Sequence, residues 1–234
     1  MCVRDRGGQV VYEHQPDLVL STASVGKLLL LIEVARSLPP DLPCDRRDVP
    51  PVADSGLWQH LRTDVLPAHD LAVLVASVSD NLATNVLLRH VGLDRVTALT
   101  AELGLTATAL HDMVRDVRAA EHPPRLSSGS AAELSLLLHR LPAVDGGDRV
   151  LDWMGTSADL SMVASAFALD PLSHAGVTLR NKTGTDDGVR ADVGVAGACT
   201  YAVLANWEPG AVPVGEVLAT MRELGDGMRA LVGK

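Results

Sequence analysis

The pattern of hydrophobic and polar positions differs from one part of the chain to another. Near the beginning, apolar stretches at 1–4 and 10–14 flank a turn at Arg6-Gly7-Gly8, which predicts a β-hairpin. Residues 24–38 are apolar almost all round, and a helix of that kind is buried in the middle of a protein. Helical patterns then dominate the middle of the chain: 54–105 with a break at 79–81, 131–141, 148–154 and, more weakly, 160–169, with an irregular loop over 106–130.

The final third changes to β-rich runs at 177–182, 189–198 and 200–207, separated by glycine-containing turns. Such runs predict an antiparallel meander, and 215–232 closes the chain as an amphipathic helix. We therefore predict an α/β (α+β) fold whose antiparallel sheet is built from both termini and flanked by helices. Residues 1–38 and 142–234 would form the sheet lobe and 39–141 an all-helical lobe, with an active site in the cleft between them.

Composition narrows the function classes. Hydrophobic residues make up 47% and charged residues 21% of the 234 positions, as in soluble globular proteins. The net charge of −9 and the lack of clustered Lys and Arg argue against binding to nucleic acid or to an anionic membrane. The longest apolar run, 28–34, is too short to span a bilayer.

The cysteines and the start of the chain bear on localisation. Cys2, Cys44 and Cys199 are widely scattered, with no metal-ligand spacing and no disulfide framework, which favours a reducing compartment. No leader pattern precedes the first strand, so we expect a cytoplasmic protein, although a trimmed leader would give the same sequence. We also expect a monomer.

A Ser-x-x-Lys motif, Ser24-Val25-Gly26-Lys27, stands at the start of the buried helix. Spacing of three places Lys27 on the same face as the Ser24 hydroxyl, where a desolvated amine could act as a base. The free N–H groups of a helix start favour a developing oxyanion. Serine is also a common helix cap, which is the alternative interpretation. The chain has only three lysines against 17 arginines, and this favours a specific use for Lys27.

Two further motifs follow in the chain. Ser79-Asp80-Asn81 lies between helical stretches, where it could equally be an ordinary turn. Lys182-Thr183-Gly184-Thr185 lies at the end of a predicted strand, where Gly184 would let a substrate approach the strand backbone. Its alternative interpretation is a strand that ends at a glycine turn.

Together the three motifs resemble the signature of class A β-lactamases and penicillin-binding proteins, Ser-x-x-Lys, Ser-Asp-Asn and Lys-Thr-Gly, in the same order and with similar separations. The resemblance implies that Ser24 attacks a lactam or ester carbonyl while Lys27, or a partner linked to it by water, takes the proton. It also implies an oxyanion hole from the backbone N–H groups of Ser24 and Thr185. Ser79, backed by Lys27 and Lys182, would pass a proton to the leaving nitrogen.

The resemblance also implies a set of substrate-binding residues. Asn81 would hold the side-chain amide of the substrate, and Thr183, Thr185 and Arg190 its carboxylate, beside Gly184. Trp58 would either wall the cleft or lie in the core. The mechanism uses only side chains and water, so no cofactor or metal is implied, and the partner is a small acyl compound.

One part of the family pattern is missing. The class A enzymes hydrolyse their acyl-enzyme with a Glu, helped by an Asn a few residues later, but no Asn occurs between Asn85 and Asn181. The corresponding region offers Asp112 and Asp116, which could activate water or could simply pair with Arg115 and Arg118. Without such a base, acylation would be normal and deacylation slow.

These departures keep two alternatives open beside a β-lactamase. One is an intracellular esterase, amidase or glutaminase-like hydrolase that uses the same Ser24-Lys27 pair on another acyl compound. The other is a penicillin-binding sensor or buffer that acylates once without turnover. The sequence has no P-loop, no Gly-x-Ser-x-Gly and no His-Glu-x-x-His, so other common catalytic motifs do not compete.

Overall fold

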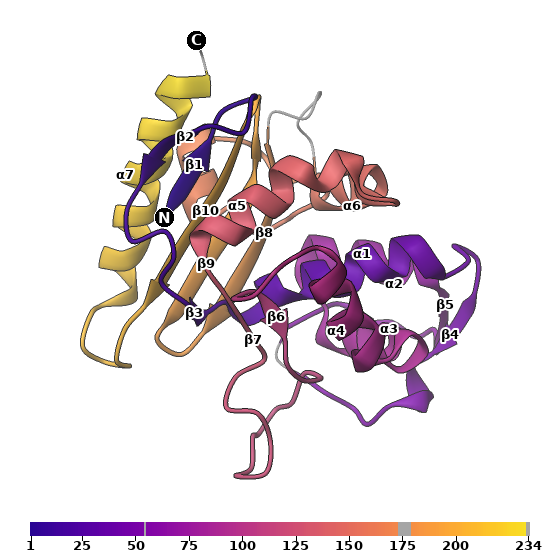
Figure 1. The fold of residues 1–234 in the computed structure, drawn as a ribbon. Helices are drawn as coiled ribbons and strands as arrows, with labels where there is room; N and C mark the ends of the chain where they lie inside the picture. Colours follow the sequence, from indigo (N-terminus) through magenta and orange to yellow (C-terminus); the bar gives the residue numbers. More distant parts are fainter. Residues whose placement is uncertain (54, 173–178, 233–234) are drawn as a thin grey trace.

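A five-stranded antiparallel sheet forms the centre of the computed structural model, which describes residues 1–53, 55–172 and 179–232 (Figure 1). The strand order is β2-β1-β10-β9-β8, so the first and the last strands of the chain pair side by side. The strands are β1 (Cys2–Arg4), β2 (Val10–Glu13), β8 (Leu179–Asp186), β9 (Val189–Ala196) and β10 (Cys199–Asn206). The predicted sheet from both termini is confirmed.

The meander of β8, β9 and β10 follows directly from its turns. Gly188 and Gly197 occupy the two hairpin turns with φ of 65° and 56°, a conformation that residues other than glycine rarely adopt. Strand β8 extends to Asp186, beyond the predicted end at Lys182, so that the Lys-Thr-Gly motif lies within the strand rather than at its end. Residues 177–178 of the predicted strand lie outside the described residues.

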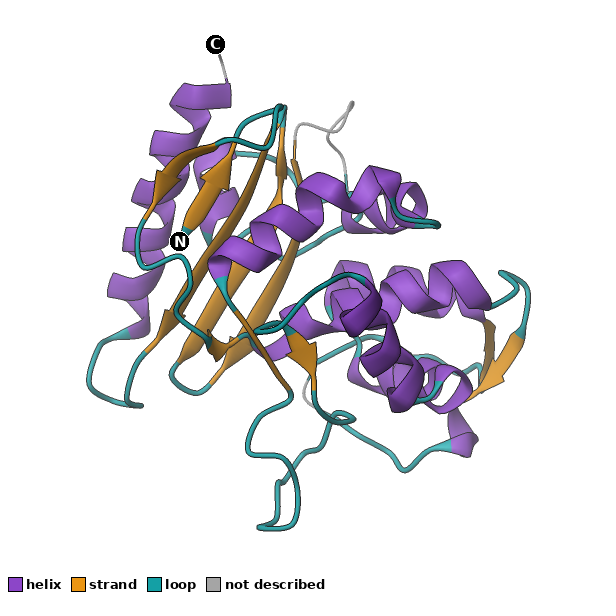
Figure 2. Ribbon diagram, in the orientation of Figure 1, coloured by secondary structure: helices purple, strands orange, loops and turns teal. Residues whose placement is uncertain are grey.

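Helices cover both faces of the sheet (Figures 1 and 2). The long helix α7 (Val214–Val232) packs on one face, where Met221 and Met228 join a core cluster with Tyr201. Helix α5 (Ala131–Arg140) lies on the other face, and α6 (Gly147–Met154) contacts β8 beside it.

The position of α5 corrects the predicted lobe boundary. We assigned 39–141 to the helical lobe, but α5 packs against β1, β9 and β10. The Thr200 hydroxyl on β10 donates to the Ser135 carbonyl, and Arg4 on β1 donates to the Ser135 hydroxyl. The apolar face of α5 therefore belongs to the sheet lobe, and the rest of the division into two lobes stays a prediction.

The buried helix predicted at 24–38 is α1 (Lys27–Ser37), preceded by the 3-10 turn η1 (Ala23–Gly26). Side chains 28–32 are at most 1% exposed, as the apolar pattern requires. Helix α1 packs against α2 (Ala68–Val78), α3 (Asn81–Val91), α4 (Leu93–Glu102) and α6. It is thus the central element of the larger core cluster.

Two helical predictions were wrong in detail. Residues 55–67 form a loop with the 3-10 turn η3 (Trp58–His60) and strand β5 (Val65–Pro67), which pairs with β4 (Pro43–Asp45). Pro67 disfavours a helix through this segment and instead stands as the cap directly before α2. The weak pattern at 160–169 is only the 3-10 turn η5 (Val163–Phe167).

The segment 106–130 is mostly loop, as predicted, and Figure 1 shows it extending away from the body of the molecule. Its two short strands, β6 (Ala109–Leu110) and β7 (Ser127–Gly129), form a small sheet with β3 (Leu20–Ser21) just before η1. A shorter 3-10 turn, η2 (Arg46–Asp48), follows β4, and η4 (Leu141–Ala143) follows α5.

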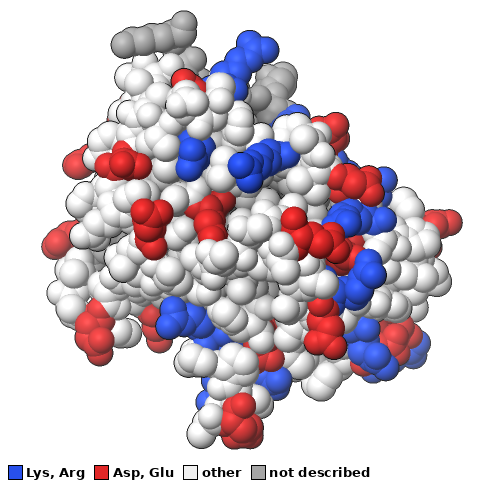
Figure 3. All heavy atoms as spheres, viewed as in Figure 1, with Lys and Arg blue, Asp and Glu red and all other residues white. Residues whose placement is uncertain are grey.

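The surface charges, the cysteines and the lengths of the helices bear on the predicted partners and compartment. On the face drawn in Figure 3, Lys and Arg side chains are interspersed with Asp and Glu rather than gathered in a basic patch. All three cysteines are buried and unpaired. In the described part of the chain, every helix is too short or too polar to cross a membrane.

Candidate active site

The three sequence motifs meet at one cavity. It has a volume of about 460 Å³ and opens between the end of α2, strand β8 and η1. Its lining residues are Ser24, Ser55, Ser77, Val78, Ser79, Ala158, Asp159, Lys182, Thr183 and Thr185. The predicted cleft thus contains a residue of every motif.

Ser24 lies on a turn whose backbone is fixed from several sides. The preceding Ala23 has a φ of 46°, and its carbonyl accepts a hydrogen bond of 2.6 Å from the buried Ser127 hydroxyl. A Cβ on Gly26 would lie 2.2 Å from the Ser127 Cβ, so only glycine fits where β7 passes the turn. A left-handed alanine directly before Ser24 is a strained conformation that packing must maintain.

Lys27 connects the first motif to the second. Its side chain is fully buried, and its ammonium donates to the Ser79 carbonyl at 2.7 Å and to the Asn81 Oδ1 at 2.7 Å. It also reaches the Ser79 hydroxyl at 3.2 Å. Because one buried amine contacts both ends of the Ser-Asp-Asn motif, it sets the position of Ser79 relative to Ser24's helix.

Asp80 organises the second motif through backbone groups. It caps α3 by accepting from the Ala83 N–H at 2.9 Å, and it accepts from the Leu57 and Trp58 N–H groups at 2.7 and 2.8 Å. A carboxylate shared among three N–H donors holds the 55–58 loop against the start of α3. Ser79 is thereby kept in a left-handed conformation, with φ of 56°.

Asn81 is less free for a substrate than the sequence suggested. Its Oδ1 accepts from Lys27, and its Nδ2 donates to the Ala53 carbonyl at 3.0 Å. It still lines a second cavity of about 590 Å³, which Ser24 and Thr185 also line. Its role toward a substrate amide stays a prediction.

Gly184 has a different reason for being glycine than the one we predicted. A Cβ there would lie 2.2 Å from the Thr22 carbonyl oxygen and 3.2 Å from the Ser24 backbone nitrogen. The missing side chain therefore lets β8 pack directly against the turn that carries Ser24. This contact brings the backbone of Thr185, the next residue, to the side of the nucleophile.

Lys182 and two carboxylates give the strand side of the cavity its electrostatics. Burial lowers the pKa of Lys182 to about 8, although Asp159 and Asp192 act to raise it. Its ammonium donates to the Thr183 carbonyl at 2.8 Å. Burial also raises the pKa of Asp192 to about 6, despite hydrogen bonds from Asn181, the Ala164 backbone and Tyr201.

Arg190 lines the second cavity but is directed partly toward its own strand turn. Its guanidinium donates to the carbonyls of Asp186 and Val189 and lies 5.9 Å from the centre of the Trp207 ring. The structure therefore brings Arg190 to the same side as Thr185, while its role in binding a carboxylate stays a prediction.

The two aspartates of the 106–130 loop are placed differently. Asp112 is buried and accepts hydrogen bonds from Arg115 at 2.8 Å and from Arg118 at 2.7 Å. It is absent from the lining of both cavities at Ser24. Asp116 lines the second cavity with Ser24, and its Oδ1 accepts from the Ala53 N–H at 3.0 Å. The arginine pairing and the position outside both cavities argue against Asp112 as a catalytic base, and that assignment stays a prediction.

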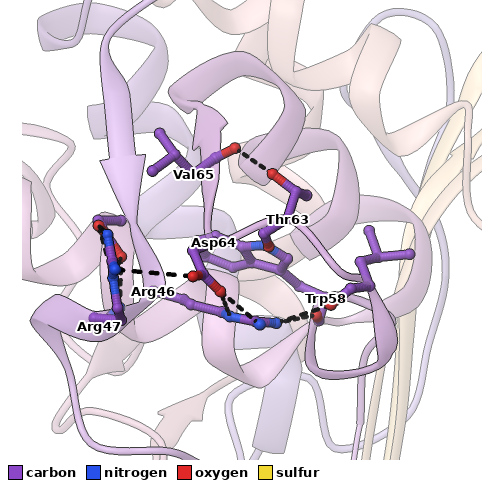
Figure 4. A network of polar contacts seen from close by, with 8 residues as sticks. Arg46, Arg47, Trp58, Thr63, Asp64 and Val65 are labelled. Atoms are coloured by element: carbon purple, nitrogen blue, oxygen red, sulfur yellow. Dashed lines mark hydrogen bonds and ion pairs between the residues drawn. The ribbon is translucent and has the colours of Figure 1, made fainter.

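Trp58 belongs to the core and not to the cleft wall. Its side chain is fully buried, and its indole N–H donates to the Thr63 carbonyl at 3.0 Å. Figure 4 shows it enclosed by the loop that Arg46 ties together through the Trp58 carbonyl and Asp64. Burying this large ring stabilises the loop more than exposing it at a cleft would.

Sequence reasoning missed two residues, one that supports the loop beside the site and one that lines the cavity. Asn85 on α3 holds the loop backbone at Val114 by donating to its carbonyl at 2.9 Å and accepting from its N–H at 2.8 Å. Asp159 lines the cavity beside Lys182 and Thr183. The position of Asn85 one helical turn beyond Asn81 was a usable signal, whereas nothing in the sequence near Asp159 marks it.

The family follows from a comparison of the whole sequence. The model of the β-lactamase enzyme family matches residues 1–226, which is nearly the whole chain. This chain belongs to the β-lactamase enzyme family. The match extends over all three motifs and over every element that lines the cavities.

Solved structures support the β-lactamase fold. A β-lactamase from Sphaerobacter thermophilus is 23% identical with a TM-score of 0.76, covering 95% of this chain and 87% of that one. A class A β-lactamase from Mycobacterium abscessus is 20% identical with a TM-score of 0.79, covering 100% and 93%. A single-site mutant of PBP-A, solved as an acyl-enzyme complex with penicillin G, is 18% identical with a TM-score of 0.78, covering 100% and 89%. No curated protein sequence matches the chain significantly.

Proposed function

We propose that this member of the β-lactamase family opens β-lactam amides through an acyl-enzyme on Ser24. The observation that carries the proposal is the convergence of Ser24, Ser79 and Lys182 on one cavity, with Lys27 buried beneath them. Serine, lysine and a second serine at one cavity supply a nucleophile and a route for its proton.

In the acylation step the Ser24 Oγ attacks the lactam carbonyl and its proton leaves through Lys27 or a water next to it. The C–N bond of the lactam then breaks, and the Ser79 hydroxyl, which Lys27 contacts at 3.2 Å, delivers a proton to the nitrogen. The backbone N–H groups of Ser24 and Thr185 stabilise the oxyanion. The close packing of Gly184 on the Ser24 turn supports this assignment, because it fixes the two backbones relative to each other.

In the deacylation step a water attacks the ester and regenerates the Ser24 hydroxyl, which needs a base. Asp116 is the loop carboxylate that lines a cavity together with Ser24, whereas Asp112 is occupied by two arginines. We therefore assign water activation to Asp116. Its exposed position predicts a weaker base effect than a carboxylate held in the cavity, and hence slow turnover.

The test is the intact mass of the protein over time with excess benzylpenicillin or its neutral methyl ester, for the native chain and for Ser24→Ala. We expect one adduct per chain, absent in Ser24→Ala, that disappears as the lactam is consumed. The same Ser24-dependent adduct in Asp116→Asn should persist longer. If neither lactam gives an adduct that requires Ser24, the proposed function is wrong.

We further propose that the protein is a monomer and works in the cytoplasm. Three buried thiols without a disulfide are the usual state of cysteines in a reducing compartment, which supports the second proposal. Light scattering on the purified chain tests the first proposal, and fractionation of cells that produce it tests the second.

A further inference from the structure

Asp159 places a carboxylate at the end of the cavity where the family resemblance predicts that the substrate carboxylate binds. It lines the same cavity as Ser24, Lys182 and Thr183. No sequence motif includes it, and the mechanism proposed above does not use it. A negative charge inside the cavity weakens the binding of an anionic substrate. Its presence is explained if it selects against such substrates.

The backbone at Asp159 is tied to both walls of the cavity. The Ala158 N–H donates to the Ser77 carbonyl of α2 at 2.9 Å. On the other side, Asn181 of β8 donates through Nδ2 to the Asp159 carbonyl at 3.2 Å. The residue therefore lies on a segment that bridges α2 and β8, and its position in the cavity is set by the fold.

The carboxylate itself is held by Ser161, two residues further along the same segment. Its Oδ1 accepts from the Ser161 hydroxyl at 2.6 Å and from the Ser161 N–H at 3.1 Å. Thr183 and Lys182 line the same cavity, and both act to lower the pKa of the Asp159 carboxyl. Burial acts to raise the pKa of Asp159, but these contacts outweigh it and lower the pKa, so the group is ionised at neutral pH.

Asp159 therefore brings a negative charge to the part of the cavity that Lys182 and Thr183 line. Those are the two groups that would otherwise bind the carboxylate of a substrate. An incoming anion at this end would meet a like charge, whereas a neutral or cationic group would meet an acceptor.

We propose that Asp159 is a specificity-determining residue that selects acyl substrates with a neutral or cationic group, rather than a carboxylate, at the Lys182–Thr183 end of the cavity. The inference rests on the proposed acylation of Ser24 and names its substrate class: lactams, esters or amides that lack a carboxylate next to the scissile bond.

The experiment compares benzylpenicillin, which carries a carboxylate beside its lactam, with its methyl ester, which differs only at that group. Second-order acylation rates come from intact mass spectrometry on the native chain and on Asp159→Asn. The matched control is Asp152→Asn on α6, an equal change of charge at a side chain that is 74% exposed. We expect Asp159→Asn to speed acylation by benzylpenicillin about tenfold or more and to change the methyl ester rate less than about threefold. Asp152→Asn should change neither.

Equal changes for both compounds, or no gain for benzylpenicillin, would overturn the proposal, because a merely structural role does not distinguish an acid from its ester. A second measurement is independent of acylation: binding of phenylacetate and of phenethylammonium, followed by NMR shifts of the amides at 182–185. Asp159→Asn should bind phenylacetate more tightly and phenethylammonium more weakly than the native chain does. Unchanged affinities for both compounds would contradict the proposal. Charge selectivity in the NMR measurement without any Ser24 adduct would refute the proposed function and leave only the charge preference of the cavity, without the substrate class.

Discussion

Asp80, which caps α3, and Asp112, in the 106–130 loop, are both buried aspartates, but their partners differ. Asp80 gives its oxygens to the backbone N–H groups of residues 57, 58 and 83. Asp112 gives its oxygens mainly to the guanidinium groups of Arg115 and Arg118. The first arrangement fixes main chain and so directs Ser79 and Asn81 toward the cavities. The second neutralises charge within its own loop and leaves no carboxylate for a substrate. The partner of a buried carboxylate, more than its burial, decides what it contributes to a site.

The sharpest test of this comparison is Asp80→Ala. Removing the carboxylate leaves three backbone donors without their acceptor in a buried place, and each such donor costs about 1–3 kcal/mol. We expect the free energy of unfolding to fall by at least about 3 kcal/mol in urea denaturation and acylation of Ser24 to be lost. Asp70→Ala, at an exposed position in the first turn of α2, is the control. Similar stability losses in both variants would contradict the organising role of Asp80.

Asp112→Ala should have a smaller effect of a different kind. Arg115 and Arg118 lose their shared partner, but their side chains are 29% and 24% exposed and water can compensate in part. We expect a loss of about 1–3 kcal/mol in the free energy of unfolding, with the acylation rate of the folded protein nearly unchanged. A large fall in acylation at full folding would show that Asp112 acts on the site and would break the comparison.

Asn85→Ala probes the link between helix α3, which Asp80 caps, and the loop that contains Asp112. Asn85 satisfies the N–H and the carbonyl of Val114, and both backbone groups lose their side-chain partner in the variant. We expect a loss of about 1–2 kcal/mol in stability and faster amide hydrogen exchange over 112–118, measured by mass spectrometry. Exchange that stays as slow as in the native chain would mean that other contacts hold this loop against α3.

The smallest expected effect is the pH dependence that the Lys182 ammonium confers. It separates an effect on the acylation rate from an effect on stability. Because the pKa of Lys182 is about 8 in the fold and higher in the unfolded chain, the unfolded state binds more protons above pH 8. The contribution of this group to stability therefore rises with pH in that window, while its ammonium is lost from the cavity. We expect acylation to fall severalfold between about pH 7.5 and 9 as Tm holds or rises. Parallel falls in both quantities would contradict a functional role for the ammonium.

The hydrophobic pattern and the three motifs predicted the main architecture, because the residues involved fold in only a few ways. The all-round apolar stretch over 28–32 had to be buried, and the glycines at 188 and 197 had to turn the chain. The order of the three motifs predicted that Ser24, Ser79 and Lys182 lie together, and all three line one cavity.

The errors came from contacts between residues far apart in the sequence. Nothing local indicates that Trp58 is enclosed by a loop tied to Asp64 or that α5 packs on the sheet. The reason for Gly184 is likewise a contact with the Thr22 carbonyl, from the opposite end of the chain. Asp159 has no motif of its own, and its importance appears only once β8 lies beside it.

The pairing of β1 with β10 has a consequence for the order of folding. Residues 2–4 are made long before their partners at 199–206 and until then can pair only with β2, so the five-stranded sheet cannot close during most of synthesis. The Ser24 turn likewise waits for Gly184 to pack against it. Long-range contacts of this kind slow folding and make it cooperative. We therefore expect a nascent chain that ends before β10 to carry every residue of the three motifs and yet to react with no lactam, with reactivity appearing abruptly once the last strand is available.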